Sequence, residues 1–134
     1  MSLVLLIHIC GAVLGLLSGA LAMIFRKGSG LHGAAGTVFF VSMLAMSSSA
    51  VFSALFLKPE RINVIAGSLT FYLVATAWRA AKNREGRTGA FDIAALLFIL
   101  VVGVTGYVFG FQSRSTGAIH FIFGTIAFVC ATTD

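Results

Sequence analysis

Long stretches without a charged side chain decide which folds this chain can adopt. The 134 residues contain five such stretches, each ended by a charged residue: 3–25, 28–57, 62–78, 93–113 and 115–133. A helix needs about 20 apolar residues to cross a membrane, and Arg79 can reach the membrane surface from a helix end, which lengthens the third stretch. Charged residues make up only 10% of the chain and its mean hydropathy is +1.05, which excludes a water-soluble domain.

These stretches predict an all-α fold, an integral membrane bundle of five transmembrane helices in a single domain covering residues 1–134. The expected spans are about 3–25, 31–57, 62–81, 93–111 and 115–133. Strands of a membrane barrel would alternate over about ten residues, whereas these stretches are continuous and rich in Leu, Ala and Phe. Short connections predict antiparallel neighbours. Asp92 is expected to stabilise the N-terminus of the fourth helix.

The positive charges predict an orientation. The side that holds the N-terminus carries three of them, Lys58, Arg61 and Arg114. The other side carries six, namely Arg26, Lys27, Arg79, Lys82, Arg84 and Arg87. Because positive residues are retained in the cytoplasm, we expect the N-terminus outside and the loop at residues 79–87 in the cytoplasm of a bacterial inner membrane. Topology and anionic lipid then explain the net charge of +5, and no nucleic acid partner is expected.

Three histidines are the strongest candidates for chemistry. No Asp or Glu lies within an expected span, which argues against carboxylate-driven transport, and an ionisable group in a membrane is a functional hypothesis by default. His8 and His120 each lie five residues into a span from its outer end, about 8 Å below the membrane boundary. His32 lies at the cytoplasmic entrance of the second span, with no partner at its depth, and is a weak candidate.

Two imidazoles at one depth on facing helices can ligate a haem iron from opposite sides. The first functional hypothesis is therefore a b-type haem electron-transfer protein, with His8 and His120 as axial ligands and with a quinone or an outer redox protein as its partner. No metal besides this candidate haem iron is expected. Cys10 and Cys130 differ in depth by more than about 7 Å, which excludes a disulfide.

Glycines accompany both histidines. Ridges of small residues let a flat macrocycle approach the backbone, but they more commonly let membrane helices pack closely. The glycines expected to serve helix packing are Gly11, Gly15, Gly19, Gly103, Gly106, Gly110, Gly117 and Gly124.

A second functional hypothesis explains the same features without a cofactor. An accessory subunit that packs within a larger respiratory or photosynthetic membrane complex would also be small, with short loops, glycine ridges and no carboxylate inside its spans. Nothing outside the expected membrane region is large enough to form a substrate site, so we do not expect an enzyme that acts by itself. The lipid bilayer and other membrane subunits are the partners of this hypothesis.

The turn into the second span reads RKGSGLHGAAGTVFF from Arg26 to Phe40. It resembles the bacterial membrane proteins grouped as domain of unknown function 2306, and the resemblance extends through His8, the LTFYL stretch at residues 69–73 and the WRA stretch at residues 78–80. The resemblance implies a small multi-span protein without an established activity. It also implies a basic loop and a sixth span with a histidine, a partner for His32, in a layout similar to two-haem transmembrane cytochromes b.

The C-terminal residues also bear on the sixth span that the resemblance implies. A fifth span that ends in the cytoplasm would normally be followed by Lys or Arg, whereas this chain ends ATTD at Asp134. We therefore expect a truncated member of the family that keeps only the outer histidine pair.

Overall fold

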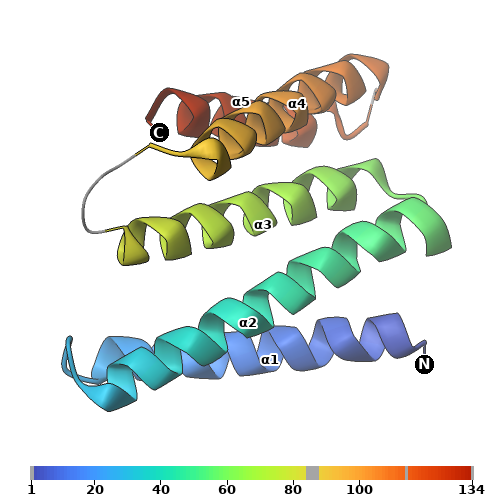
Figure 1. Ribbon diagram of the computed structural model, residues 1–134. Coiled ribbons are helices and arrows are strands. Elements are labelled where there is room, and N and C mark those ends of the chain that lie inside the picture. Colours follow the sequence, from blue (N-terminus) through green and yellow to red (C-terminus); the bar gives the residue numbers. More distant parts are fainter. Residues whose placement is uncertain (1, 84–87, 114, 134) are drawn as a thin grey trace.

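The computed structural model is all-helical over the residues that it describes, 2–83, 88–113 and 115–133 (Figure 1). The helices are α1 Leu3–Ile24, α2 Gly30–Phe52, the short π-helical η1 Ser53–Leu57, α3 Arg61–Lys82, α4 Ala90–Gln112 and α5 Gly117–Thr133. Four helical segments are long and apolar enough to cross a membrane: Leu3–Ile24, Gly30–Leu57, Arg61–Lys82 and Ala90–Gln112. The predicted helical class is confirmed. The fifth predicted span is also a helix, but its 17 residues make it shorter than the other four.

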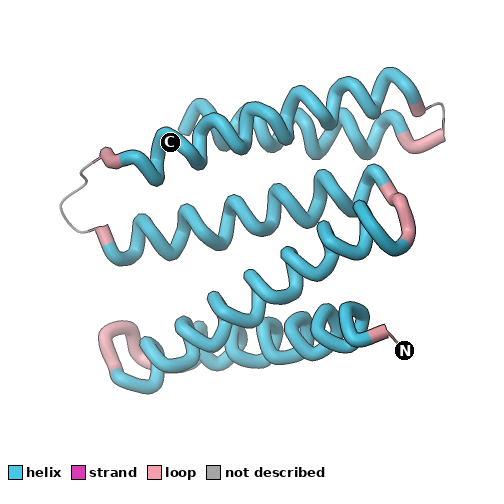
Figure 2. Tube along the Cα trace, turned by 45° about the vertical axis from the view of Figure 1, so that its right-hand side comes forward, coloured by secondary structure: helices cyan, strands magenta, loops and turns pink. Residues whose placement is uncertain are grey.

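The helices form three layers (Figures 1 and 2). The hairpin of α1 and α2 is one outer layer, α3 is the middle layer, and the hairpin of α4 and α5 is the other outer layer. The pairs that pack are α1 with α2, α2 with α3, α3 with α4 and α5, and α4 with α5; other pairs of these described helices make at most marginal contact. Consecutive helices are antiparallel, so the α2–α3 and α4–α5 connections lie at the end that holds the N-terminus.

Small side chains bring α1 and α2 together. A Cβ atom placed on Gly11 would lie 2.9 Å from the carbonyl oxygen of Ser42 and 3.2 Å from the backbone nitrogen of Met46, and one on Gly15 would lie 2.9 Å from Sδ of Met43. The buried polar residues of this hairpin are Ser18, Ser42, Ser47 and Ser49. Because lipid tails are as apolar as a protein core, this kind of close packing is what holds membrane helices together.

Glycines also line the contact between α4 and α5. A Cβ atom on Gly106 would lie 3.0 Å from Cα of Gly124, and one on Gly117 would lie 2.8 Å from the carbonyl oxygen of Gly110. The apolar core lies on this side of the molecule, between α3, α4 and α5, and consists of Ile65, Leu69, Tyr72, Ile99, Val102 and Ala127. The fold thus has a small-residue contact in each hairpin and an apolar core on one side of α3.

Local signals in the sequence account for the helix ends. Gly28 has a positive φ of 86°, which favours glycine, and the hydroxyl oxygen of Ser29 then caps α2. The Asp92 carboxylate accepts the backbone N–H of Gly89 at 2.7 Å and pairs with the Arg79 guanidinium at 3.5 Å. Asp92 therefore stabilises the start of α4, as the sequence predicts.

Candidate functional site

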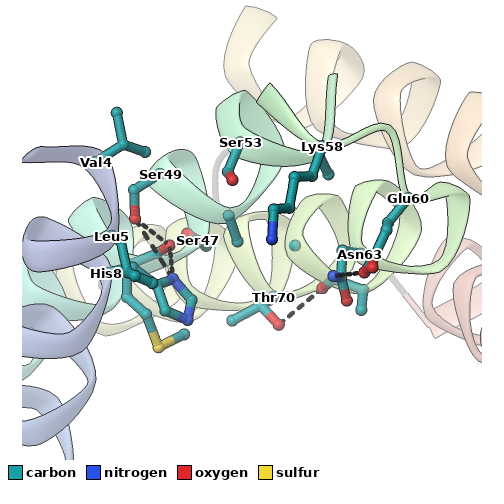
Figure 3. A pocket seen from close by; sticks show the side chains of 15 residues that line it. Val4, Leu5, His8, Ser47, Ser49, Ser53, Lys58, Glu60, Asn63 and Thr70 are labelled. Atoms are coloured by element: carbon teal, nitrogen blue, oxygen red, sulfur yellow. Dashed lines mark hydrogen bonds between the residues drawn. The ribbon is translucent and has the colours of Figure 1, made fainter. Parts of the chain in front are cut away.

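A cavity of about 370 Å³ with a cluster of polar side chains in its lining lies between α1, α2, η1 and α3, near the end that holds the N-terminus (Figure 3). Its apolar lining comes from short or flexible side chains, among them Leu5, Met46 and Ala54. Its polar lining converges from three helices and one turn: His8, Ser47, Ser49, Ser53, Lys58, Glu60, Asn63 and Thr70. In a chain with so few charged residues, this gathering of polar side chains marks the candidate site.

The π-helical turn at the end of α2 shapes the cavity. The backbone N–H of Lys58 donates to the carbonyl oxygen of Ser53 at 2.9 Å, a bond across five residues instead of four. Pro59 follows, and the residue before a proline avoids the α conformation, so the helix ends here. Such widened turns occur frequently at functional sites. In Figure 3 the Lys58 side chain extends from this turn into the cavity, toward His8.

His8 presents one ring nitrogen to the cavity. Its Nδ1 lies 3.1 Å from the carbonyl oxygen of Met46 and 3.5 Å from the hydroxyl of Ser49. A bond to a carbonyl oxygen requires the proton on Nδ1. Nε2 of a neutral His8 therefore carries a lone pair and acts as a hydrogen-bond acceptor.

Three hydroxyl groups of the cavity are acceptors for the same reason. Ser49 donates its proton to the carbonyl oxygen of Met46 at 2.7 Å, and Thr70 donates to that of Ala66 at 2.9 Å. Ser47 does the same within α2, to Met43 at 2.8 Å. Their oxygens keep lone pairs, but their protons are already used. The inner part of the cavity therefore offers acceptors to a ligand.

Donors lie at the mouth of the cavity, next to the turn. The ammonium group of Lys58 has three protons, and Nδ2 of Asn63 donates to the Glu60 carboxylate at 2.5 Å. Within the part of the chain that the structure describes, the ion pair that is formed joins Arg79 and Asp92, and Lys58 has no carboxylate partner. The mouth thus supplies an available cation beside an amide and a carboxylate.

His120 lies in another part of the molecule. Its side chain is buried, with 2% of its surface exposed, between the edge of the Phe109 ring and the start of α5. Nδ1 donates to the carbonyl oxygen of Thr116 at 2.8 Å. Nε2 is buried without a hydrogen-bond partner among the described residues. A buried nitrogen in this state carries a free energy cost.

His32 lies at the opposite end of the molecule, where α2 and α3 separate. Its Nδ1 donates to the carbonyl oxygen of Ala22 at 2.8 Å. It borders a second cavity of about 440 Å³, lined mainly by apolar and aromatic residues. Trp78 and Phe40 are stacked there with ring centroids 4.1 Å apart, and Nζ of Lys82 lies 4.7 Å from the Trp78 ring centre.

The structure does not bring His8 and His120 together. Both lie toward the end with the N-terminus, as their depth predicts, but α1 packs on α2 whereas α5 packs on α4 and α3. The two histidines therefore occupy opposite outer layers, and the facing helices that a shared haem iron requires are not present within the described chain. No group of three or more His, Cys, Asp or Glu that could hold a metal ion occurs among these residues either.

Sequence reasoning missed most of the site. Lys58, Asn63 and Thr70 were not singled out, because Lys58 lies in the turn after η1 whereas Asn63 and Thr70 lie on α3, and the cavity exists only where these elements meet α1 and α2. The signal available in the sequence was the occurrence of Asn63 and Thr70 on one expected helix, seven residues apart and thus on one face.

Comparison with known proteins adds no relative. No family model, no curated protein and no solved structure matches the chain. The resemblance to domain of unknown function 2306 therefore stays a prediction.

Proposed function

We propose that the chain is a cofactor-free accessory subunit that packs within a larger membrane complex. One observation carries the proposal: the two hairpins are joined through the single middle helix α3. A closed bundle surrounds each inner helix with neighbours, whereas α3, the middle layer between the two hairpins (Figure 2), keeps exposed apolar side chains such as Phe71 and Leu73. A helix of another subunit fits beside α3 and would complete the layer.

The cavity beside His32 supports this proposal. A Cβ atom placed on Gly33 or Gly36 would have no atom within 4 Å. This face of α2 therefore lacks side chains at these two positions, and no other part of the described chain fills the space. Beside them Phe40, one turn further along α2, stacks on Trp78 of α3. Small residues allow a second helix to approach closely, and an aromatic surface supplies contact area. Glycines at the other helix contacts face a neighbour, whereas these two face open space.

The proposal includes the orientation with the N-terminus outside a bacterial inner membrane and residues 79–87 in the cytoplasm. Arg26 and Lys27 lie in the turn between α1 and α2, and Lys82 ends α3. Both segments lie at the end opposite the N-terminus (Figure 1). Trp78, one turn before Lys82, has the position of an aromatic residue at a membrane interface. Arg84 and Arg87 lie outside the described residues.

Filling the open face of α2 is expected to disrupt assembly without unfolding the chain. Gly36→Leu adds a side chain where the protein has room, so helix content and thermal stability of the purified chain stay unchanged. The fraction of tagged chain that migrates with its complex on native electrophoresis falls at least tenfold. Ala20→Leu, on the exposed side of α1, is the control and keeps the complex. An unchanged complex in Gly36→Leu, or a wild-type chain that is monomeric after mild solubilisation, contradicts the proposal.

Haem ligation is the second candidate, and a specific observation favours it. All three histidines donate Nδ1–H to a backbone carbonyl and leave Nε2 available, which is how ligating histidines are usually held. Nε2 of His120 is also buried without a partner among the described residues. Since His8 and His120 lie in separate layers, a haem with two histidine ligands would take its second one from another subunit.

An optical spectrum distinguishes the two candidates. Reduced and oxidised spectra of the purified complex are expected to show no band from this subunit if it is an accessory subunit. A Soret band that disappears in His120→Ala and persists in Phe109→Leu, a change at the ring beside His120, would establish haem ligation instead. Helix content measured by circular dichroism shows whether each variant is folded.

A further inference from the structure

The cavity beside His8 offers a ligand two kinds of hydrogen-bonding group in two places. Its inner part presents acceptors, namely Nε2 of His8 and the oxygens of Ser49 and Thr70, whose protons are bound to helix carbonyls. Its mouth presents the ammonium group of Lys58, which has no carboxylate partner in the described part of the chain. A complementary ligand donates a hydrogen bond at one end and accepts one at the other.

We propose that this cavity binds the head group of a quinol, an aromatic ring with two hydroxyl groups on an apolar tail. One hydroxyl donates to Nε2 of His8, and the oxygen on the opposite side of the ring accepts from Nζ of Lys58. Leu5, Ala50, Ala54 and Ala66 supply apolar surface for the ring. The site does not depend on the accessory-subunit role, but it does exclude His8 as a haem ligand, because the same Nε2 lone pair accepts from the quinol.

The chemistry of the lining favours a quinol over a lipid phosphate. A phosphate diester has no proton to donate, so the acceptors of the inner cavity would face its oxygens. Glu60 also lies at the mouth, held by Asn63, and would repel an anion. A neutral ring with a hydroxyl group at each end leaves the charges of Lys58 and Glu60 balanced.

Size and access agree with such a ligand. About 370 Å³ is at the small end of the range for ligand cavities, and a single substituted ring fills it. Val4 and Leu5 form the α1 side of the cavity, and Leu5 is 46% exposed on the outer surface of the bundle. An apolar tail leaves the cavity past these side chains into lipid. On the other side, Gly67 closes the cavity, because α3 approaches Val51 of α2 there.

Binding of decylubiquinol, measured by calorimetry under anaerobic conditions, tests the proposal. The full chain is placed in phosphatidylcholine nanodiscs, since this lipid has no hydrogen-bond donor that would compete, and empty nanodiscs are the reference. We expect saturable binding at one site per chain. His8→Ala and Lys58→Met each weaken it at least tenfold, as loss of one hydrogen bond to the ligand predicts. Oxidised decylubiquinone, which has no hydroxyl proton for His8, binds at least tenfold more weakly.

Matched variants distinguish binding at the His8 cavity from an unspecific effect of losing a histidine or a lysine. His32→Ala and Lys82→Met remove the same residue types at the opposite cavity, and binding is expected to stay within twofold of the wild type. His8→Gln restores binding, because its side-chain oxygen can accept in place of Nε2, and it also shows that loss in His8→Ala is not unfolding. The absence of saturable binding, equal affinity for the oxidised and reduced probe, or full binding in His8→Ala overturns the proposal.

Discussion

Replacing Gly106 by Leu is expected to lower the free energy of unfolding by about 3 kcal/mol. The Cβ atom alone would lie 3.0 Å from Cα and 3.2 Å from the backbone nitrogen of Gly124, and 3.3 Å from the carbonyl oxygen of His120. These atoms belong to the backbone of α5 and cannot rotate away, so α4 and α5 must separate. When the two helices separate, packing contacts are lost along the whole hairpin. Lipid tails enter the space between α4 and α5 only partly, so they do not replace these contacts.

Unfolding by sodium dodecyl sulfate in mixed micelles, followed by circular dichroism, measures this change. Gly36→Leu is the matched control, because the same substitution there meets no atom within 4 Å, and its unfolding curve should coincide with that of the wild type. Equal stability of Gly106→Leu and the wild type would show that α4 and α5 are not in close contact.

Ile99→Ala is expected to cost about 3 kcal/mol, within the range for truncation of a buried isoleucine. Ile99 has no exposed surface and lies in the core between α3, α4 and α5. Removing three of its carbon atoms leaves a cavity that neither lipid nor water can enter. In a membrane the loss is one of dispersion contacts, since a lipid-exposed state would be equally apolar.

Ile93→Ala provides the control on the same helix. Ile93 is 58% exposed, so a lipid chain moves into the space of the missing atoms, and we expect a loss below about 1 kcal/mol. The same unfolding assay compares the two variants. If both variants lose equal stability, the core of this protein does not lie between α3, α4 and α5.

Much of the fold was predictable because charges and breakers mark the helix ends. The stop at Lys58 and Pro59, the start near Asp92 and the turn at Gly28 all follow from local chemistry that acts over a few residues. The extra residue in the π-helical turn before Lys58 was not predictable, because it depends on how α2 meets α3. The fifth helix begins at Gly117, two residues after the start of the predicted span at residue 115.

The sequence did not predict which helices are neighbours in space. Depth along the membrane is expected from counting residues, and His8 and His120 do lie toward the same end of the bundle. Their helices are not neighbours, and periodicity does not reveal this, because a face toward lipid and a face toward protein are equally apolar in a membrane. The exposed Leu16 of α1 and the buried Ile99 of α4 are the same kind of residue to any hydropathy scale.

The backbone contacts at Gly11 and Gly106 also indicate how this sequence can change over evolutionary time. Any apolar residue serves on a lipid-facing surface, so positions such as Leu16 are free to exchange among Leu, Ile, Val and Phe. A position where two backbones touch accepts only hydrogen in place of a side chain. The glycines at these contacts thus help to specify which helices pair, and they are positions to compare when distant relatives are sought.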